Sequence, residues 1–364
     1  MATVCFVGSF PPAAGGQALV NESFRRMAED AGAKVNIIDL SSRSGPATWR
    51  RRLSRVPKLL FGIPKFLTVM IGRRADVVYI GVSGGHGQLY DIAFTSLAAL
   101  TRLRLYLHHD SYAYLGRRRA LTAPLIRIAG PSAVHIVLCE DMKERLTALY
   151  GRALQIVVVS NMTNIEPPLL HPQARTRLKT IGFISHLSRS KGVLEFLDVA
   201  ERMHSLHPDM LAKLAGPIEE PSLAPVIEER LRHAPWITYV GPVYGESKSR
   251  FYAGIDAFVF PTHYENEADP RVINEALVHG VAVIARGRGC IESVMAGGGG
   301  VIIREDGDFV DEALSLLLAW YSDPGLMSSI SSAAMANSAR LDADHRIRLN
   351  TIIGGLVSAS TQTT

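Results

Sequence analysis

The sequence predicts an α/β protein made of two doubly wound domains, each a parallel sheet covered by helices on both faces. Three observations support this prediction. The chain has 364 residues, which is enough for two ordinary domains. Short β-branched runs alternate with helix-length segments along most of its length, as in parallel sheets buried on both faces. A proline-containing stretch from residue 161 to 178 separates two such series.

The first series contains six expected strands with helices between them. The strands are expected at Val4–Gly8, Lys34–Asp39, Val77–Gly81, Arg104–His108, Val134–Cys139 and Gln155–Val159. The helices include Val20–Ala31, Tyr90–Thr101 and Asp141–Tyr150. We therefore assign residues 1–165 to an N-terminal Rossmann-like domain and residues 166–178, which hold three prolines, to a linker.

The alternation restarts at residue 179. Strands are expected at Lys179–Ile184, Ala212–Ala215, Ile237–Val240, Ala257–Pro261, Val281–Ala285 and Gly300–Ile303. Helices are expected at Val193–Leu206, Leu223–His233, Ser247–Ala253, Phe309–Trp320, Pro324–Ala339 and about Ala343–Val357. The pattern predicts a second Rossmann-like domain over residues 179–340. Residues 341–364 are expected to hold a C-terminal helix that packs back toward the N-terminal domain.

Composition favours a globular protein of the cytoplasm. Hydrophobic residues make up 47% of the chain and charged residues 20%, so a large core is expected and disorder is not. Cys5, Cys139 and Cys290 lie far apart without a CxxC pair, which argues against a disulfide framework or a zinc site. We expect no secretory signal and no membrane span, because no apolar run approaches the ~18 residues that a span needs.

A basic segment, residues 49–74, interleaves cationic and large apolar side chains. Arg50, Arg51 and Arg52, for example, are flanked by Trp49 and Leu53. This pattern suits an anionic membrane surface, so we expect peripheral attachment at the inner face of the plasma membrane. The alternative is a solvated basic helix pair that covers a sheet. Nucleic acid is not an expected partner, because no recognised nucleic-acid-binding pattern accompanies the charge.

The segment from residue 264 to 276, YENEADPRVINEA, is the clearest candidate site. It follows an expected strand, so it lies at the carboxyl end of the sheet, where open parallel sheets bind ligands. Asp269 is a good helix N-cap, and Pro270 suits the first helical position. The backbone N–H groups at this helix start are then expected to bind an anion; they belong to Arg271, Val272 and Ile273.

Two carboxylates frame this helix start. Glu267 lies in the expected loop, and Glu275 lies about a turn and a half inside the helix. A helix end that binds phosphate and two carboxylates that accept hydrogen bonds from hydroxyls suit a phosphorylated, polyhydroxylated ligand. The alternative is purely structural, since many helices begin with Asp-Pro and a nearby Glu for capping alone.

Four motifs occur in a characteristic order. A Pro-Pro-Ala-Ala-Gly-Gly loop ending at Gly16 follows the first strand, and Ser160-Asn161-Met162 looks like an altered Pro-Asn-Gly turn near the linker. Lys191-Gly192 opens the first helix of the second domain, and seven residues separate Glu267 from Glu275. In these features the chain, from Val4 to about Gly354, resembles the retaining nucleotide-sugar glycosyltransferases of glycosyltransferase family 4. The resemblance implies the GT-B fold, in which two Rossmann-like domains face each other across a cleft.

The resemblance also implies residue roles in binding the donor. Lys191 would pair with the donor diphosphate, Glu267 would hydrogen-bond the transferred sugar, and Glu275 would hydrogen-bond the nucleotide ribose. His109, at the end of an expected strand, resembles a family histidine that contacts the donor sugar. We therefore predict Glu267, Lys191 and His109 as the catalytic residues.

Further residues are predicted to bind the donor. Gly15 and Gly16 lack a Cβ and would let a ligand approach the backbone closely. Many relatives have an arginine five positions before the lysine, where this chain has His186. Arg189 is the nearest arginine that could substitute for it.

The implied reaction transfers a sugar, with retained configuration, from a nucleotide-diphosphate sugar to a glycan or lipid-linked acceptor in cell-surface polysaccharide synthesis. We expect neither a cofactor nor a divalent metal, because no Asp-x-Asp motif directly ends an expected strand. Two alternatives stay open: a non-catalytic GT-B protein that binds sugars or a partner, and an epimerase or phosphorylase on the same fold. A dinucleotide-dependent oxidoreductase and a P-loop enzyme are disfavoured, because neither fingerprint is present.

Overall fold

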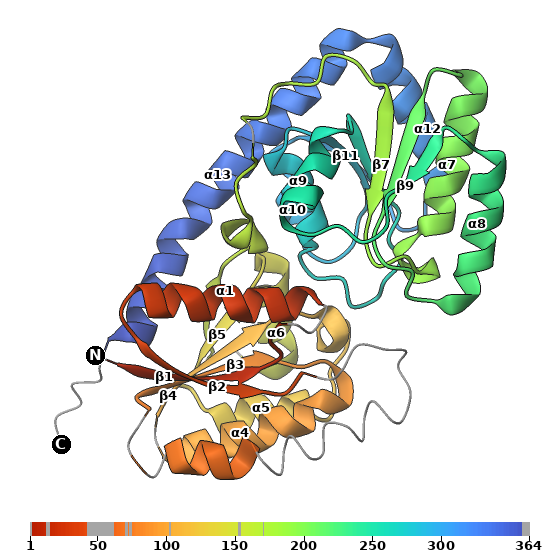
Figure 1. The fold of residues 1–364 in the computed structure, drawn as a ribbon. Helices are drawn as coiled ribbons and strands as arrows, with labels where there is room; N and C mark the ends of the chain where they lie inside the picture. The colour runs from red at the N-terminus through yellow and green to blue at the C-terminus, as the bar shows by residue number, and fades with distance from the viewer. Residues whose placement is uncertain are drawn as a thin grey trace. The chain divides into compact units, whose positions relative to one another are not determined.

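The chain forms two compact units in a computed structural model, which describes residues 2–11, 15–41, 62–69, 72, 75–101, 103–151, 154–169 and 171–358. The first unit combines Met1–Asn164 with Asp344–Thr364, and the second is Ile165–Ala343. Each unit contains one six-stranded sheet (Figure 1). The predicted fold class, two Rossmann-like α/β domains, is therefore confirmed.

The first sheet is parallel throughout, with the strand order β2-β1-β3-β4-β5-β6. Its strands are β1 (Thr3–Gly8), β2 (Lys34–Asp39), β3 (Val77–Val82), β4 (Arg104–His109), β5 (Val134–Val137) and β6 (Gln155–Val158). Its helices are α1 (Gly16–Asp30), α4 (Gln88–Leu100), α5 (Thr122–Ala129) and α6 (Glu140–Tyr150). Figure 1 shows α1 on one face of this sheet and α4 and α5 on the other. Helix α5 was missed in the sequence, and the other elements were predicted with small errors at their ends.

The second sheet is also parallel, with the strand order β12-β11-β10-β7-β8-β9. Its strands are β7 (Thr180–Ile184), β8 (Leu211–Ala215), β9 (Ile237–Tyr239), β10 (Ala257–Phe260), β11 (Ala282–Arg286) and β12 (Gly300–Ile303). Its helices are α7 (Val193–Leu206), α8 (Ala224–His233), α9 (Gly245–Ala253), α10 (Arg271–Val278), α11 (Ile291–Met295) and α12 (Phe309–Ser322). Every residue of β7, β10 and β11 is buried, as expected for central strands covered on both faces.

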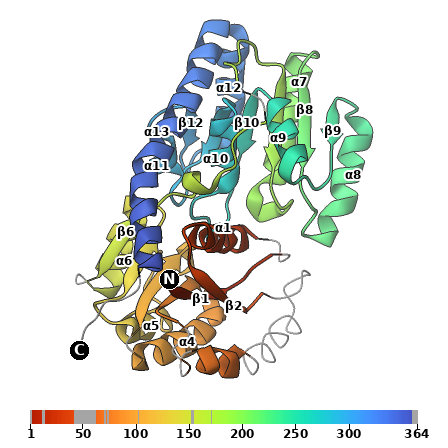
Figure 2. The same ribbon diagram turned by 60° about the vertical axis from the view of Figure 1, so that its left-hand side comes forward.

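The last helix differs from its prediction. The two expected helices, Pro324–Ala339 and about Ala343–Val357, form the single helix α13 (Pro324–Val357), which is drawn unbroken in Figure 2. No glycine or proline occurs between Leu326 and Ile353, so nothing in the sequence interrupts the backbone hydrogen bonds there. The Asp323 carboxylate caps the start of the helix by accepting hydrogen bonds from the N–H groups of Gly325 and Leu326.

The C-terminal end of α13 is part of the core of the first unit. Leu349, Ile352, Ile353 and Leu356 are buried with apolar residues of β1, β3 and α1. Residues from both ends of the chain therefore share one hydrophobic cluster.

Cys5 of β1 is a free, buried thiol, and burial raises its pKa to about 12.

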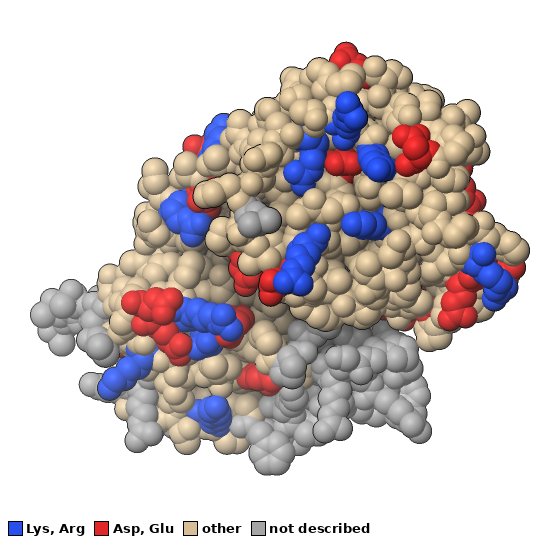
Figure 3. Space-filling model, turned by 45° about the horizontal axis from the view of Figure 1, so that its top comes forward, with Lys and Arg blue, Asp and Glu red and all other residues tan. Residues whose placement is uncertain are grey.

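The segment predicted to bind an anionic membrane, residues 49–74, lies largely outside the described residues. Of the basic segment 49–74, the structure describes residues 62–69, which are helical, and residue 72, and Phe66 and Val69 are buried there. On the face drawn in Figure 3, charged side chains of both signs are interspersed. Several charged side chains of the described residues form ion pairs, such as that of Arg25 with Glu22. Among the described helices, none has the length and apolar character needed to cross a bilayer.

The packing of α13 leads to a stability prediction. Leu356→Ala should lower the free energy of unfolding by about 2–5 kcal/mol, because it opens a cavity in the core of the first unit. Ile347→Ala, on the same helix but 73% exposed, should change it by less than about 0.5 kcal/mol. Chemical denaturation of both variants checks this. Equal effects at the two positions would contradict the packing described for the helix.

Candidate functional site

The strand order of the second unit creates a natural ligand site. From β7 the chain continues to β8 and β9 on one side of the sheet, then returns to β10, β11 and β12 on the other. The loops that follow β7 and β10 therefore lead in opposite directions from adjacent strands, and such a switch point leaves a crevice at the carboxyl edge of the sheet. Lys191 follows β7 and Glu267 follows β10, so both predicted catalytic residues of this unit lie at that edge.

A glycine brings these two loops into contact. Lys191 ends the 3₁₀ turn Arg189–Lys191, and its N–H donates to the hydroxyl of Ser188 at 3.3 Å. Gly192 follows with a φ of 82°. A Cβ on Gly192 would lie 2.4 Å from the carbonyl oxygen of Pro261, just beyond β10. The Lys-Gly pair in the sequence therefore has a physical reason, since only glycine permits this turn at this distance.

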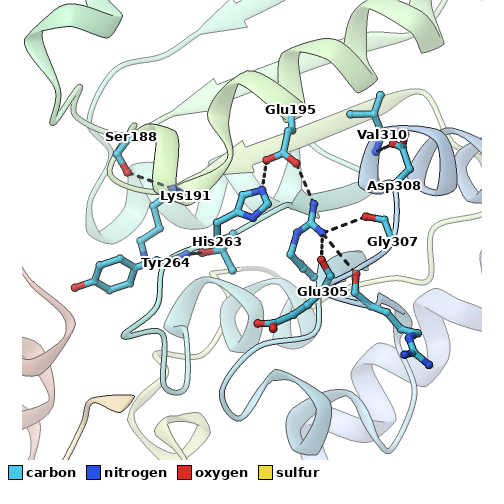
Figure 4. Close-up of polar contacts among 12 residues, drawn as sticks. Ser188, Lys191, Glu195, His263, Tyr264, Glu305, Gly307, Asp308 and Val310 are labelled. Carbon is cyan, nitrogen blue, oxygen red and sulfur yellow. Dashed lines mark hydrogen bonds and ion pairs between the residues drawn. The ribbon is translucent and has the colours of Figure 1, made fainter. Parts of the chain in front are cut away.

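Lys191 and Glu267 form a direct ion pair. The lysine Nζ lies 2.5 Å from Oε2 of Glu267, and the Thr262 hydroxyl donates to the same oxygen at 3.1 Å. The lysine nitrogen also lies 4.5 Å from the centre of the Tyr264 ring, a cation–π contact visible in Figure 4. Glu267 is only 7% exposed. The cation expected to bind a diphosphate and the carboxylate expected to bind a sugar are thus in contact.

Glu275 has a separate set of partners. It lies on α10 and is 5% exposed. Its carboxylate accepts hydrogen bonds from Lys248 and from the Tyr252 hydroxyl, the latter at 3.0 Å, and Nε of Arg271 lies 4.0 Å away. Burial, followed by the neighbouring carboxylate, raises the pKa of Tyr252 well above its ordinary value, so the tyrosine remains a hydrogen-bond donor.

Lys248 and Tyr252 were not predicted as site residues. One signal was present in the sequence: the two residues are four positions apart on an expected helix, so they share one of its faces. Nothing in the sequence showed that this face turns toward Glu275. That arrangement depends on how α9 and α10 pack in the folded unit.

The start of α10 corrects two details of the prediction. Pro270 is the N-cap, with an extended backbone (φ −66°, ψ 113°), and the first helical residue is Arg271. Asp269 does not cap the helix, and its carboxylate instead accepts a hydrogen bond from the Asn274 side chain at 2.7 Å. The N–H of Ile273 donates to the carbonyl oxygen of Pro270 at 3.0 Å, so it is not one of the free groups of the helix end.

Arg189 is turned toward another loop. Its guanidinium lies 3.8 Å from Glu220, and its backbone N–H donates to the same carboxylate at 3.0 Å. His186, which occupies the position of the usual family arginine, lies 3.8 Å from Glu219. The structure therefore places both residues against the loop after β8, and it pairs Lys191 with Glu267 without them.

In the first unit, the predicted glycines follow β1 at the switch point between β1 and β3. Gly15 is the N-cap of α1, and Gly16 is its first residue. A Cβ on either would meet no described atom within 4 Å. The glycines are therefore not required by packing among the described residues.

His109 is placed differently from its prediction. It is fully buried at the end of β4, with Nδ1 2.9 Å from the Tyr114 hydroxyl and Nε2 3.0 Å from Nδ1 of His135. Burial, together with its histidine neighbours, holds its pKa well below the ordinary value. A neutral imidazole with both nitrogens bonded has no atom left for a donor sugar in this conformation. The predicted contact of His109 with the donor sugar would require these hydrogen bonds to rearrange.

One Asp-x-Asp sequence lies in the second unit, outside its strands. Asp306-Gly307-Asp308 is an Asp-x-Asp sequence a short way beyond β12. Asp308 accepts hydrogen bonds from Val310 and Asp311 as the N-cap of α12, and Asp306 pairs with Arg304. Both carboxylates have structural partners. Among the described residues, no three His, Cys, Asp or Glu side chains come together as metal ligands would.

Comparisons with known proteins identify one matching family model and several similar structures. Residues 178–319 match the family model described as "Glycosyl transferases group 1". HepE from Anabaena, crystallised with UDP, has a TM-score of 0.73 at 14% identity, with 96% of this chain and 99% of that chain covered. Sucrose-phosphate synthase from Thermosynechococcus elongatus has a TM-score of 0.75 at 14% identity, with 99% and 100% covered. WaaG, a glycosyltransferase involved in lipopolysaccharide biosynthesis, has a TM-score of 0.66 at 13% identity, with 98% and 100% covered.

A comparison with curated protein sequences gives no match. At 13–14% identity the structural likenesses establish the fold. The chain has the GT-B fold. Its second unit, which contains Lys191, Glu267 and Glu275, carries the sequence pattern of group 1 glycosyl transferases. The resemblance to GT-B glycosyltransferases predicted from the sequence is thereby confirmed.

The buried histidines predict a loss of stability in acid. Burial lowers the pKa of His108 to about 3 and that of His135 to about 4, and it also lowers that of His109. All three stay neutral in the folded state, whereas in the unfolded chain they protonate near pH ~6.5. Their contribution to the free energy of unfolding is therefore complete above pH ~6.5, and it decreases as the pH falls below that value. At pH ~5.5 each histidine should lower the free energy of unfolding by about 1.4 kcal/mol, and the three together should lower it by about 4 kcal/mol.

Urea denaturation of the wild-type chain at two pH values, about 7.5 and 5.5, measures this loss. His108→Gln should reduce the difference between the two free energies by about 1.4 kcal/mol. His86→Gln, which replaces an exposed histidine of the same unit, is the matched control and should leave the difference unchanged. Equal stability of the wild-type chain at both pH values would show that these imidazoles are not held neutral.

Proposed function

We propose that the chain is a retaining glycosyltransferase that moves a sugar from a nucleotide-diphosphate sugar to a glycan or lipid-linked acceptor. The glycosyltransferase class is supported by the group 1 family match and the GT-B fold. The observation on which the finer proposal rests is the contact of Lys191 with Glu267 at the switch point of the second sheet. A lysine cation and a carboxylate side by side at the carboxyl edge of the sheet would suit the two halves of a sugar diphosphate.

The leaving group of this reaction is a nucleoside diphosphate, which gains negative charge as the glycosyl–phosphate bond breaks. The Lys191 ammonium has three donor hydrogens, so it can approach a diphosphate oxygen and stabilise this charge. The start of α10, with the N–H groups of Arg271 and Val272, adds the positive end of a helix dipole near Glu267. These groups act on charge that is largest in the transition state, which is the condition for catalysis.

The two glutamates would hold the neutral parts of the donor. Glu275 is fixed by Lys248 and Tyr252 and would accept hydrogen bonds from the ribose hydroxyls. Glu267 would exchange its contact with Lys191 for hydroxyls of the transferred sugar once a diphosphate occupies the lysine. The donor would then replace an existing ion pair, so binding of the diphosphate and release of Glu267 would be coupled.

Related structures indicate which donors and acceptors to test first. HepE has been crystallised with UDP-glucose and with UDP and glucose, so uridine nucleotides are the first candidates. WaaG is involved in lipopolysaccharide biosynthesis, in line with a lipid-linked or polysaccharide acceptor. Attachment to an anionic membrane through residues 49–74, a location at the cytoplasmic face, and independence from metals remain predictions.

The main competing function is a GT-B protein that binds sugars without transferring them. It is favoured by the pairing of Arg189 with Glu220, because that pairing leaves the predicted diphosphate site with one cation fewer than expected. An epimerase or phosphorylase acting on nucleotide sugars is a further alternative. The three functions differ in whether, and when, free nucleoside diphosphate is released.

A thermal-shift screen of UDP-, GDP- and ADP-sugars tests the proposal. A donor present at about 100 times its Kd should stabilise the folded chain by ~2.7 kcal/mol. Lys191→Ala and Glu275→Ala should abolish this shift, whereas Lys143→Ala, which removes an exposed lysine of the first unit, should retain it. Acceptor-dependent release of nucleoside diphosphate would establish transfer. Binding without release would identify a sugar-binding protein, and absence of any binding would refute the proposal.

Because Glu267 pairs with Lys191, replacing the two glutamates should change the affinity for UDP in opposite directions. Glu267→Gln removes the carboxylate that competes with a diphosphate for Lys191, so free UDP should bind about 3–10-fold more tightly, which corresponds to ~0.7–1.4 kcal/mol. Sugar transfer should fall at least about 100-fold because a neutral amide is a weaker acceptor for the sugar hydroxyls. Glu275→Gln should instead weaken UDP binding. Calorimetry of the two variants with UDP measures both effects, and weaker UDP binding by Glu267→Gln would contradict the exchange described above.

A further inference from the structure

A buried arginine links several loops at the carboxyl edge of the second sheet. Arg286 ends β11, and its side chain is 4% exposed. One of its terminal nitrogens donates to the carbonyl oxygens of Arg304, Glu305 and Gly307, in the loop after β12, at 3.1–3.5 Å. Its other terminal nitrogen donates to the Glu195 carboxylate at 3.0 Å. The guanidinium also lies 5.1 Å from the centre of the Phe309 ring.

Glu195 shares its carboxylate between two loops. It lies in the first turn of α7, just after Lys191-Gly192. Its Oε1 accepts from Arg286, and its Oε2 lies 2.8 Å from Nε2 of His263. Figure 4 shows Glu195 between His263 on one side and the loop of Glu305 and Gly307 on the other. Glu195 thus connects the loop after β10 to Arg286 of β11, and Arg286 in turn holds the loop after β12.

His263 lies between the two residues that contact the Lys191–Glu267 pair. Thr262, before it, donates its hydroxyl to Glu267, and Tyr264, after it, carries the ring that Lys191 approaches. The His263 backbone N–H donates to the carbonyl oxygen of Ser190, beside Lys191, at 2.7 Å. The backbone and the side chain of His263 therefore both tie the loop after β10 to the start of α7.

We propose that Glu195, Arg286 and His263 are positioning residues that hold Thr262, Tyr264 and Glu267 in register with Lys191. The inference rests on the proposed function for its catalytic consequence, but it describes a contact network outside the predicted donor-binding groups. Glu195 and Arg286 are linked to the Lys191–Glu267 pair only through His263 and its neighbours in the contacts described above. Their effect on transfer would pass through the geometry of that loop.

The buried charge of Arg286 explains why Glu195 and the loop after β12 must keep their positions. A buried guanidinium is costly unless a carboxylate and other acceptors surround it. Arg286 finds these acceptors in Glu195 of α7 and in three carbonyl groups of the loop after β12. Moving either element would leave buried charge without its partners. The position of Glu195, and therefore the anchor for His263, is fixed by this requirement.

The variant that isolates the effect is His263→Ala. The side chain is 47% exposed, so its loss should leave the folded unit intact while releasing the loop from Glu195. With UDP-glucose as donor, kcat should fall about 10–100-fold, because a displacement of a catalytic group by about 1 Å has this size of effect. The affinity for UDP should change by less than about threefold, since the Lys191 turn keeps its own contact with Ser188. His263→Gln, which can still donate to Glu195, should restore kcat to within about threefold of wild type.

A matched control uses another arginine of the same unit. Arg230 of α8 pairs with Asp198 and Glu201, which are also on α7 but at positions away from the loop after β10. Arg230→Ala removes a comparable ion-pair cluster from the same helix, and it should leave kcat and UDP affinity within about twofold of wild type. Glu195→Ala should behave as His263→Ala does in kcat. An equal loss of kcat in Arg230→Ala would show general weakening of α7 and would overturn the inference.

Hydrogen exchange gives a readout that does not depend on activity. In His263→Ala the backbone amides of residues 262–269 should exchange at least about tenfold faster than in the wild-type chain, without any ligand. In Arg230→Ala they should not. If the wild-type chain neither binds UDP nor cleaves UDP-glucose, the exchange result still decides whether the network holds the loop, and the proposed function fails separately. Unchanged exchange in His263→Ala, or equal losses of kcat and UDP affinity, would overturn the positioning role.

Discussion

The site depends on the close approach of two loops that follow neighbouring strands. Gly192 has space for no side chain against the carbonyl group of Pro261, and this contact places Lys191 over Tyr264 and against Glu267. The order of the strands sets up the meeting, because β7 and β10 are adjacent although their loops are 76 residues apart in the sequence. Sheet topology therefore supplies the crevice, and one glycine determines how closely its walls approach.

Electrostatics then distinguishes the two glutamates, which the sequence presents as equivalent. Glu275 is held by a lysine and a tyrosine of α9, so it is a fixed acceptor. Glu267 is balanced by Lys191 and a threonine hydroxyl, and Lys191 is the group that an anionic ligand would attract. In the proposed binding mode the diphosphate competes with Glu267 for Lys191, whereas the ribose approaches Glu275. The two carboxylates can therefore respond differently to the same donor.

The two sheets and the positions of Lys191, Glu267 and Glu275 could be predicted from the sequence. Continuous β-branched runs mark central parallel strands, and the motifs follow these strands in order. The errors arose where the answer depends on contacts between distant residues. Pro270 displaced the helix start by one residue, and nothing in the sequence of His109 revealed that Tyr114 and His135 enclose it. The network of Glu195, His263 and Arg286 had no sequence signal at all. Its members come from three separate loops and helices, and a buried guanidinium becomes apparent only after folding.

The switch point of the first unit uses the same packing device with different chemistry. A Cβ on Gly81 of β3 would lie 2.5 Å from Oδ1 of Asn21, and one on Gly8 of β1 would lie 2.7 Å from Nδ2 of the same side chain. Asn21 donates to the carbonyl oxygen of Ser9 and accepts from Tyr79, which in turn contacts His108. The glycines thus let α1 approach the strands through neutral polar groups, where the second unit presents an ammonium and two carboxylates. In the second unit, Lys191 and Lys248 each pair with a glutamate near the switch point, which supports the proposal that this unit binds the anionic donor.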